Sequence, residues 1–475
     1  MSISIPDLKF RPKMTVLSPE QVKEIHWASL EVLERTGIVV NHPKALEFLD
    51  GAGCRVDRDR VRIPAWLVEE CLRRAPHRLT LGRRDGRREV FLQGGNSWFG
   101  PSLDCLDYLD PVDGRLPFKL EHCAKNARLA EALPNYSWSM VVGMASDQET
   151  HLADRLIVKA ALTNCDKPLV FCCNDLEALK AVHEMAVIIA GSREKFDQAP
   201  FIVHYSEPIS PLTYFGPAVD KAIYCCENRI PLIILSAPQA GGTSPASLAG
   251  TVVQGNAESL SGLVLSQVIA PGAPFVYGTQ TTVMDMRTTI FTYGSAEQAL
   301  MIGAVAQMAQ FYDLPLFSTA GSTDSKYIDP QAGIEATFQC LTAAATGSSL
   351  VHDCGSWMDH GSLASPEYMV MINDILSMVN QLMKGLEVNQ DSLAVEAIDQ
   401  VGPGGNYLQH PSTLKRFKDV YYSKLFDRSM AFKPDNPRFG ERLRDLTLKY
   451  MVQEPAALPQ EVITELDKLE ASWRK

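Results

Sequence analysis

The sequence predicts a parallel (β/α)8 TIM barrel, because one pattern recurs along its middle part. Between about residue 97 and residue 355, a short apolar run ends in small or polar residues and is followed by a polar stretch and a helix-length amphipathic segment, eight times in all. Most runs are apolar throughout, as expected when helices cover one face of a sheet and barrel-core side chains fill the other. Several begin with proline, which a strand tolerates at its first residue. A doubly wound open sheet is the alternative architecture.

The expected elements alternate regularly along the chain. The eight expected strands span residues 97–100, 138–143, 168–172, 201–206, 231–236, 274–278, 315–319 and 349–354. The helices expected between them include residues 151–163, 176–189, 217–227, 296–312 and 333–346.

The chain has 475 residues, about twice the length of a minimal barrel, so about half of it should be additional structure. Residues 1–95 predict an α+β layer, with helices over 18–36, 43–51 and 64–74 and strands at 79–81 and 90–92. We expect the catalytic barrel to span residues 96–390. A turn-rich Gly402-Pro403-Gly404-Gly405 junction lies in the remaining segment, 391–475, which predicts a helical extension.

The composition predicts an enzyme-sized globular protein with a formal net charge of −11. A diffuse acidic balance argues against nucleic acid or an anionic membrane surface as partner. The first residues lack the features of a signal peptide, and no apolar stretch reaches the length of a bilayer span. We therefore expect a cytoplasmic protein.

The eleven cysteines form no CxxC pair and no spacing typical of zinc or iron–sulfur ligands. They predict reduced core thiols in a protein with no metal ion of its own. Cys172 and Cys354 lie at expected strand ends, which leaves a role for either thiol open.

The chemistry of a TIM barrel lies in the segments that follow its strands. Here these segments are polar and acidic but poor in cations, with Lys326 and Arg287 the basic residues nearby, which argues against phosphorylated sugars or nucleotides. Gly241-Gly242 precedes a helix, where a flexible loop or helix entry is favoured over an anion site.

Aromatic residues are abundant near the same strand ends, and their negative π faces attract a quaternary ammonium ion. We expect ring walls from Phe99, Tyr205, Tyr277 and Trp357, although any single ring could belong to the core instead. Glu207 is expected to hold the cation electrostatically, or else to form an ion pair with a neighbouring strand.

His352 lies where the last apolar strand turns polar, directly before Asp353. We interpret His352 as a hydrogen-bond donor or acid–base group, with a satisfied core histidine as the alternative. The predicted catalytic residues are thus His352 and Glu207. His352 and Gln280 are expected to bond a substrate carboxylate or hydroxyl, and Asp353 to contact the cation.

Three segments resemble the trimethylamine methyltransferase (MttB-like) superfamily of corrinoid-dependent methyltransferases. They are Leu17-Ser18-x-Glu20 with Leu33-x-x-Thr36-Gly37-Ile38, Ala320-Gly321-Ser322-x-Asp324-Ser325-Lys326 continuing to Glu335, and Gly402-Pro403-Gly404-Gly405-Asn406-Tyr407-Leu408 with His410 and Thr413. The resemblance covers nearly the whole chain. It implies a barrel whose mouth accepts the corrinoid (cobalamin) of a separate corrinoid-binding protein.

One departure from the family narrows the expected substrate. Members that demethylate trimethylamine carry pyrrolysine, whereas this chain has ordinary residues throughout, so it resembles the branch associated with glycine betaine and related quaternary amines. Methyl transfer to Co(I) requires the nitrogen to leave as a neutral amine, and a quaternary ammonium satisfies this condition. The enzyme must then supply orientation and desolvation.

Two alternatives remain open at this level. A barrel methyltransferase that uses a pterin would keep the fold and reaction class, whereas a betaine sensor would bind the amine without turnover. The polar strand ends favour an enzyme. A homo-oligomer is also possible, since the Met-rich segment 369–383 could pack either at an interface or in the core.

Overall fold

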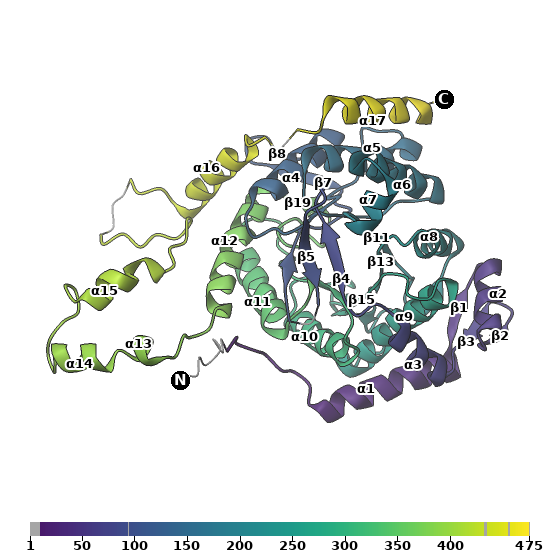
Figure 1. Cartoon of the computed structure of the whole chain (residues 1–475), viewed down its shortest axis with the longest axis horizontal. Helices are drawn as coiled ribbons and strands as arrows, with labels where there is room; N and C mark the ends of the chain where they lie inside the picture. Colours follow the sequence, from purple (N-terminus) through teal and green to yellow (C-terminus); the bar gives the residue numbers. More distant parts are fainter. Residues whose placement is uncertain (1–9, 94, 432–434, 455–456, 475) are drawn as a thin grey trace, which may run out of the picture.

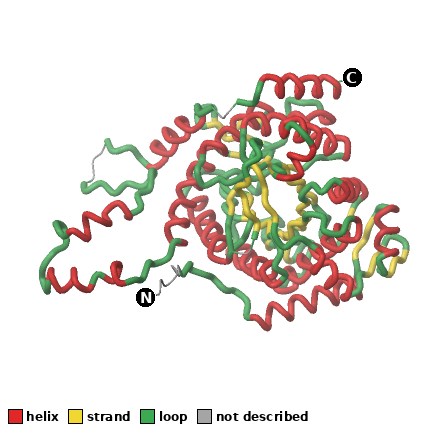
Figure 2. Tube along the Cα trace, viewed as in Figure 1, coloured by secondary structure: helices red, strands yellow, loops and turns green. Residues whose placement is uncertain are grey.

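The computed structural model describes residues 10–93, 95–431, 435–454 and 457–474. At its centre is an eight-stranded sheet ringed by helices (Figures 1 and 2). In sheet order the strands are β6 (Trp98–Phe99), β18 (Leu350–His352), β17 (Leu316–Thr319), β15 (Phe275–Thr279), β13 (Leu232–Ser236), β11 (Ile202–Ser206), β10 (Leu169–Phe171) and β9 (Ser139–Met140). Each lies within or at the edge of a segment expected to form a strand.

The sheet closes into a barrel, so the open-sheet alternative is wrong. Every neighbouring pair in the sheet is parallel. Between the two end strands, Phe99 forms a parallel bridge with Tyr136, and the Ser137 amide donates to the Phe99 carbonyl over 2.8 Å. The backbone therefore remains hydrogen-bonded around the ring, which confirms the (β/α)8 prediction.

The barrel helices follow the expected pattern. They are α4 (Leu120–Ala132), α5 (Thr150–Asn164), α6 (Leu176–Ala190), α8 (Gly216–Glu227), α9 (Leu248–Ile269), α10 (Ala296–Phe311), α11 (Pro330–Thr346) and α12 (Pro366–Met383), with the short α7 (Arg193–Gln198) after α6. Local signals set several ends: Asp329 caps the start of α11 by accepting from the Ala332 amide, and Gly347 ends it in the left-handed region, at φ 77°.

A hairpin closes the barrel at the amino-terminal ends of its strands. Its strands β4 (Leu79–Gly82) and β5 (Arg88–Leu92) pair antiparallel, and its apolar side chains Leu81, Val90 and Leu92 are buried in one cluster with the barrel-interior residues. The interior of the barrel is thus a packed core at this end, and the carboxyl-terminal mouth, where the sites of TIM barrels lie, is not closed by this hairpin.

The other amino-terminal elements pack on the outside of the barrel. They comprise α1 (Pro19–Glu31), a π-helical turn at Val32–Thr36, β1 (Ile38–Val40), α2 (Pro43–Gly51), β2 (Arg55–Asp57), β3 (Arg60–Arg62) and α3 (Ala65–Arg74). Helices α1, α2 and α3 all contact α9, and β1 pairs in parallel with β12 (Thr213–Tyr214), which follows barrel strand β11.

Short strands decorate the mouth: β7 (Asp107–Asp110), β8 (Gly114–Pro117), β14 (Gln239–Ala240), β16 (Thr282–Val283) and β19 (Leu363–Ala364). Beyond α12, a projecting segment carries α13 (Gln390–Leu393), α14 (Val395–Val401), α15 (Pro411–Arg416) and a 3-10 turn at Phe417–Asp419. Helices α16 (Phe439–Met451) and α17 (Gln460–Trp473) then return to the barrel wall (Figure 1). Among the described residues, no helix is both long and apolar enough to cross a bilayer.

Candidate functional site

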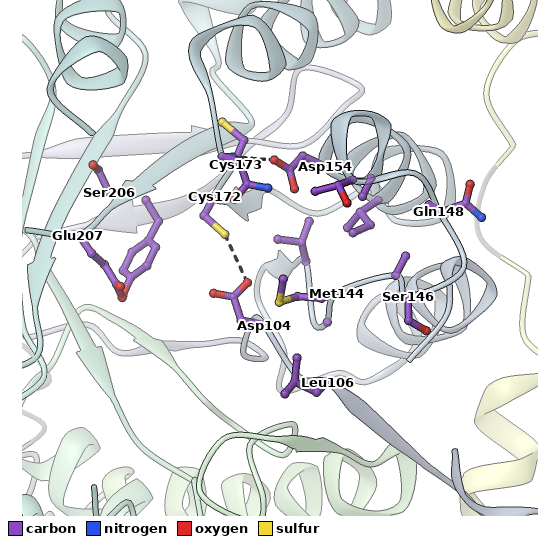
Figure 3. A pocket seen from close by; sticks show the side chains of 18 of the residues that line it. Asp104, Leu106, Met144, Ser146, Gln148, Asp154, Cys172, Cys173, Ser206 and Glu207 are labelled. Carbon is purple, nitrogen blue, oxygen red and sulfur yellow. Dashed lines mark hydrogen bonds between the residues drawn. The ribbon is translucent and has the colours of Figure 1, made fainter. Parts of the chain in front are cut away.

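A cavity of about 580 Å³ opens at the barrel mouth, beside the carboxyl ends of β9, β10 and β11. Its wall includes the segment after β9, the turn Cys172-Cys173-Asn174 after β10, and Tyr205 to Glu207 at the end of β11 (Figure 3). Asp104, which follows β6, completes the wall on the side that faces Cys172.

Glu207 and Tyr205 are the predicted residues that line this cavity. Side chains two positions apart lie on the same side of a strand, and Tyr205 packs inside the barrel against Phe317, with ring centroids 5.6 Å apart. The Tyr205 hydroxyl donates a hydrogen bond to Oε1 of Glu207. Glu207 is open to the cavity but surrounded by protein, and this desolvation, together with the charges of Asp104 and Asp353, raises its pKa to about 8.

Asp104 is the second carboxyl group that faces the cavity. Its backbone lies in the left-handed region, at φ 59°, and the Cys172 thiol donates to its Oδ1 over 3.6 Å. Desolvation raises the pKa of Asp104 to about 6. Desolvation and the nearby charge of Asp104 raise the pKa of the Cys172 thiol well above its ordinary value. Cys172 is therefore a protonated hydrogen-bond donor here and not a thiolate.

Asp353 is held on the opposite side of the mouth by three polar neighbours. Gln280 donates from Nε2 to its Oδ2 over 3.0 Å, Thr319 donates to the same oxygen, and His352 Nδ1 lies 2.6 Å from Oδ1. All four residues are buried, and Asp353 has a φ of 72°. None of His352, Gln280 and Asp353 lines the cavity. His352 and Gln280 position the buried Asp353, whose charge contributes to the raised pKa of Glu207.

The surroundings of His352 have features of both interpretations made from the sequence, a core histidine and a polar group of the site. Its ring stacks on Phe317 at 4.3 Å and an interplanar angle of 6°, as a core histidine would. Its Nε2, however, is buried without a hydrogen-bond partner among the described residues. Trp357, a predicted ring wall, lies 6.3 Å from His352 and 5.0 Å from Tyr293 between ring centroids, but it does not line the cavity.

Two predicted ring walls are wrong. Tyr277 faces outward from β15, where its hydroxyl donates to Asn256 of α9 over 2.7 Å. Phe99 faces outward from β6 and packs in a cluster with residues of α4, α11 and α12. Both strands are apolar on both faces, so an aromatic residue at the end of either strand need not point into the mouth.

The positive charge at the cavity is sparse. Among the residues that line it, Lys221 of α8 is the one with a cationic side chain, and its Nζ donates to the Cys173 carbonyl. Asp154 of α5 lies in the same part of the wall and accepts from the Asn174 amide over 2.6 Å. No group of three or more His, Cys, Asp or Glu side chains suited to a metal ion occurs in the described part of the chain.

Comparison with known proteins decides the family. Residues 3–433 match the sequence model described as trimethylamine methyltransferase (MTTB). The chain belongs to this family. Among its relatives are a glycine betaine methyltransferase of Desulfitobacterium hafniense strain Y51, 33% identical over 422 residues and 88% of each chain, and a trimethylamine methyltransferase of D. hafniense strain DCB-2, 32% identical over 87% of this chain and 84% of the relative. A trimethylamine methyltransferase of Methanosarcina thermophila is 32% identical over 88% of each chain.

Membership of the trimethylamine methyltransferase family confirms the predicted enzyme class, a methyltransferase. It does not by itself identify the functional residues, and sequence reasoning overlooked three that line the cavity: Asp104, Asp154 and Lys221. Asp104 carried a signal, because it follows the first strand in a polar segment. Asp154 and Lys221 lie on helices, where charged residues usually face solvent, and nothing in their sequence context distinguishes them.

Proposed function

We propose that this methyltransferase transfers a methyl group from a small quaternary amine, such as glycine betaine or a related betaine, to the corrinoid of a separate carrier protein. The observation that carries the proposal is the pair of carboxyl groups, Asp104 and Glu207, that face one cavity with a single lining cation. The protein around these two carboxyl groups, and for Glu207 the charge of Asp104, make them costly to ionise without a partner, and a bound ammonium ion supplies that partner.

The geometry suits a positively charged group with apolar surroundings. Glu207 and Asp104 supply the negative field, and the Tyr205 hydroxyl fixes the orientation of Glu207. On the far side, Asp353 is held rigidly by Gln280 and Thr319. Because these groups are already positioned, the field costs little reorganisation when the substrate binds.

A reduced corrinoid presented at the mouth supplies the nucleophile for the methyl group. The residues of this chain then bind and orient the amine and exclude water. They stabilise the cation in its ground state no more than its orientation requires. As the methyl group departs, the nitrogen loses its charge, so a field stronger than needed would slow the reaction. With pKa values of about 6 and 8, Asp104 is mainly ionised and Glu207 mainly protonated near neutral pH, so before the amine binds the pair carries about one negative charge, which limits that field.

The rim of the mouth offers a surface for the carrier protein. Several βα loops each expose a large apolar side chain there: Leu106, Met144, Ile209, Met286 and Tyr327. Exposed apolar side chains that encircle one opening are typical of a protein interface. We place the corrinoid carrier on this rim, and the enzyme in the reducing cytoplasm to which its eleven free thiols are suited.

The test is anaerobic methyl transfer to reduced free cobalamin, followed by the change in its visible spectrum, with a panel of quaternary and tertiary methylamines. The proposal predicts turnover with at least one quaternary amine and loss of turnover in Glu207→Gln. Turnover with tertiary amines alone would contradict it. Binding of a quaternary amine without turnover, even with the cognate corrinoid carrier present, would instead indicate a sensor.

A further inference from the structure

Lys221 of α8 is a cation without an acidic partner in a cavity lined by three carboxyl groups. It is half-buried, and its Nζ donates to the Cys173 carbonyl. Within the described part of the chain it forms no ion pair, although Asp104, Asp154 and Glu207 line the same cavity. An ammonium group has three N–H donors, so a single carbonyl leaves donors and charge available to a ligand.

The turn after β10 places Lys221 beside the proposed ammonium site. The Cys172 thiol donates to Asp104 over 3.6 Å, and the carbonyl of the next residue, Cys173, accepts from Lys221. Asp104 and the Lys221 ammonium group are thus held by consecutive residues, whose Cα atoms are about 3.8 Å apart. Desolvation is the main cause of the raised pKa of Glu207, and the charge of Lys221 opposes it. A small molecule can therefore contact both the acidic groups and Lys221.

The other side of the mouth is poorly suited to an anion. Asp353 is buried there, and its carboxyl group already uses the donors of Gln280 and Thr319. His352 has a buried Nε2 without a partner among the described residues, but its Nδ1 pairs with Asp353 and the residue does not line the cavity. A substrate carboxylate placed on this side would meet a like charge.

Asp154 of α5 lies in the same part of the wall as Lys221 but does not neutralise it. Asp154 accepts from the Asn174 amide over 2.6 Å and forms no ion pair within the described residues. Figure 3 shows Asp154 and Glu207 on opposite sides of Asp104, so the carboxyl groups are spread along the wall. The cavity as a whole therefore favours cations, and Lys221 is the feature that favours an anion.

We propose that Lys221 binds the carboxylate of a zwitterionic substrate while Glu207 and Asp104 hold its ammonium group, so that the enzyme selects betaines over quaternary amines without a carboxylate. This inference rests on the proposed function and names its substrate class. The two charges of glycine betaine are separated by one methylene group, which suits acidic and basic groups held by consecutive residues. An ammonium–carboxylate hydrogen bond is of the strong, charge-assisted kind. An amine that lacks the carboxylate would leave Lys221 unpaired, and sites built to bond a group discriminate against analogues without it.

The test is isothermal titration calorimetry at neutral pH with glycine betaine and its amide. The amide keeps the quaternary ammonium group and the shape but replaces the carboxylate with a neutral group. If Lys221 had no role, the amide should bind more tightly, because it carries a net positive charge into an acidic cavity. We expect the wild type to prefer glycine betaine instead, by about tenfold or more. Lys221→Met and Lys221→Gln should each abolish or reverse this preference by weakening the binding of glycine betaine alone.

Two further variants serve as controls. Lys221→Arg keeps the charge and should retain part of the preference. Lys180→Met removes a lysine of α6 that pairs with Glu177 at 2.7 Å outside the cavity, and it should retain all of the preference. Binding of the amide by Lys221→Met or Lys221→Gln shows that the variant is folded.

The outcomes separate this inference from the proposed function. Equal binding of the two compounds by the wild type, or an unchanged preference in Lys221→Met and Lys221→Gln, would overturn the role of Lys221 and leave quaternary-amine binding intact. Failure of the wild type to bind either compound would overturn the proposed function, and this inference with it.

Discussion

Tyr205 and Glu207 are two residues apart at the end of β11, and the Tyr205 hydroxyl donates a hydrogen bond to Oε1 of Glu207. The two side chains share the interior side of the strand, so the ring packs on Phe317 while the carboxyl group reaches the cavity. The carboxyl group is thereby fixed in orientation at the point where we propose that a cation binds.

Glu207→Gln should weaken the binding of a quaternary amine by about a hundredfold, equivalent to about 2.7 kcal/mol. At about pH 9, where Glu207 is ionised, the substitution removes a charge but preserves shape, and two unit charges 4 Å apart at a surface-like dielectric interact by about 4 kcal/mol. Isothermal titration calorimetry measures the change. Glu149→Gln, an exposed carboxylate at the start of α5, is the control and should leave the affinity unaltered. An equal loss of amine affinity in both variants would show that Glu207 has no specific role in binding.

Amine affinity should increase with pH between about 5 and 9. The pKa of Asp104 is about 6 and that of Glu207 about 8, so both groups lose protons, and gain the charge that holds a cation, over this window. Calorimetry in buffers of different ionisation enthalpy should detect proton release on binding near pH 7. An affinity that is flat over this range would contradict the assignment.

The conformational stability of the ligand-free enzyme should fall as pH rises, opposite to the amine affinity. Because the pKa of Glu207 is raised from 4.5 to about 8, its contribution to stability is complete below pH 4.5 and is lost as pH rises through 8. The melting temperature should therefore fall across this window, less steeply in Glu207→Gln. Wild type and variant with the same slope would show that Glu207 ionises normally.

Thr319→Val should reduce amine affinity by about tenfold or more, because it removes a hydrogen-bond donor to a carboxylate, an interaction of about 1.5–3 kcal/mol. Thr319 donates to the same Asp353 oxygen as Gln280. The matched variant Thr319→Ser retains the hydroxyl and loses only a methyl group. Titration of both variants distinguishes loss of the hydrogen bond from loss of packing. If the two variants bind the amine with similar affinity, the orientation of Asp353 does not affect binding.

Leu92→Ala in the β4–β5 hairpin, which closes the amino-terminal end of the barrel, should lower the free energy of unfolding by about 2–5 kcal/mol, the range typical of buried leucine. Leu92 is fully buried at the end of the barrel opposite the mouth, so amine affinity should not change. Denaturant unfolding provides the measurement. Its neighbour Phe91 is 44% exposed, and Phe91→Ala should cost far less.

The sequence predicted the barrel well because its strands are enclosed. Strands buried on both faces, such as Ile202–Ser206 and Leu232–Ser236, appear as short apolar runs, and the helices between them begin and end at recognisable caps. The same property limited the prediction of the site. In a strand that is apolar on both faces, nothing in the pattern says that Tyr205 points inward and Tyr277 outward.

The mouth itself was only partly predictable, for a physical reason. Asp104 and Cys172 are 68 positions apart in the chain, and only the closure of the barrel brings β6 and β10 to the same opening. Gln280, expected to contact substrate, instead donates to Asp353, a contact over 73 positions that no local pattern encodes. Strand ends indicated the end of the barrel at which the cavity lies but not which side chains meet there.

The most direct measurement of the central claim compares glycine betaine with 3,3-dimethylbutyrate, in which carbon replaces the charged nitrogen at nearly constant shape. If the carboxyl groups at the mouth recognise a quaternary ammonium ion, calorimetry will show betaine binding at least about a hundredfold more tightly, a preference of about 2.7 kcal/mol that Glu207→Gln largely abolishes. Equal binding of the two compounds, or a preference unchanged in Glu207→Gln, would contradict the account.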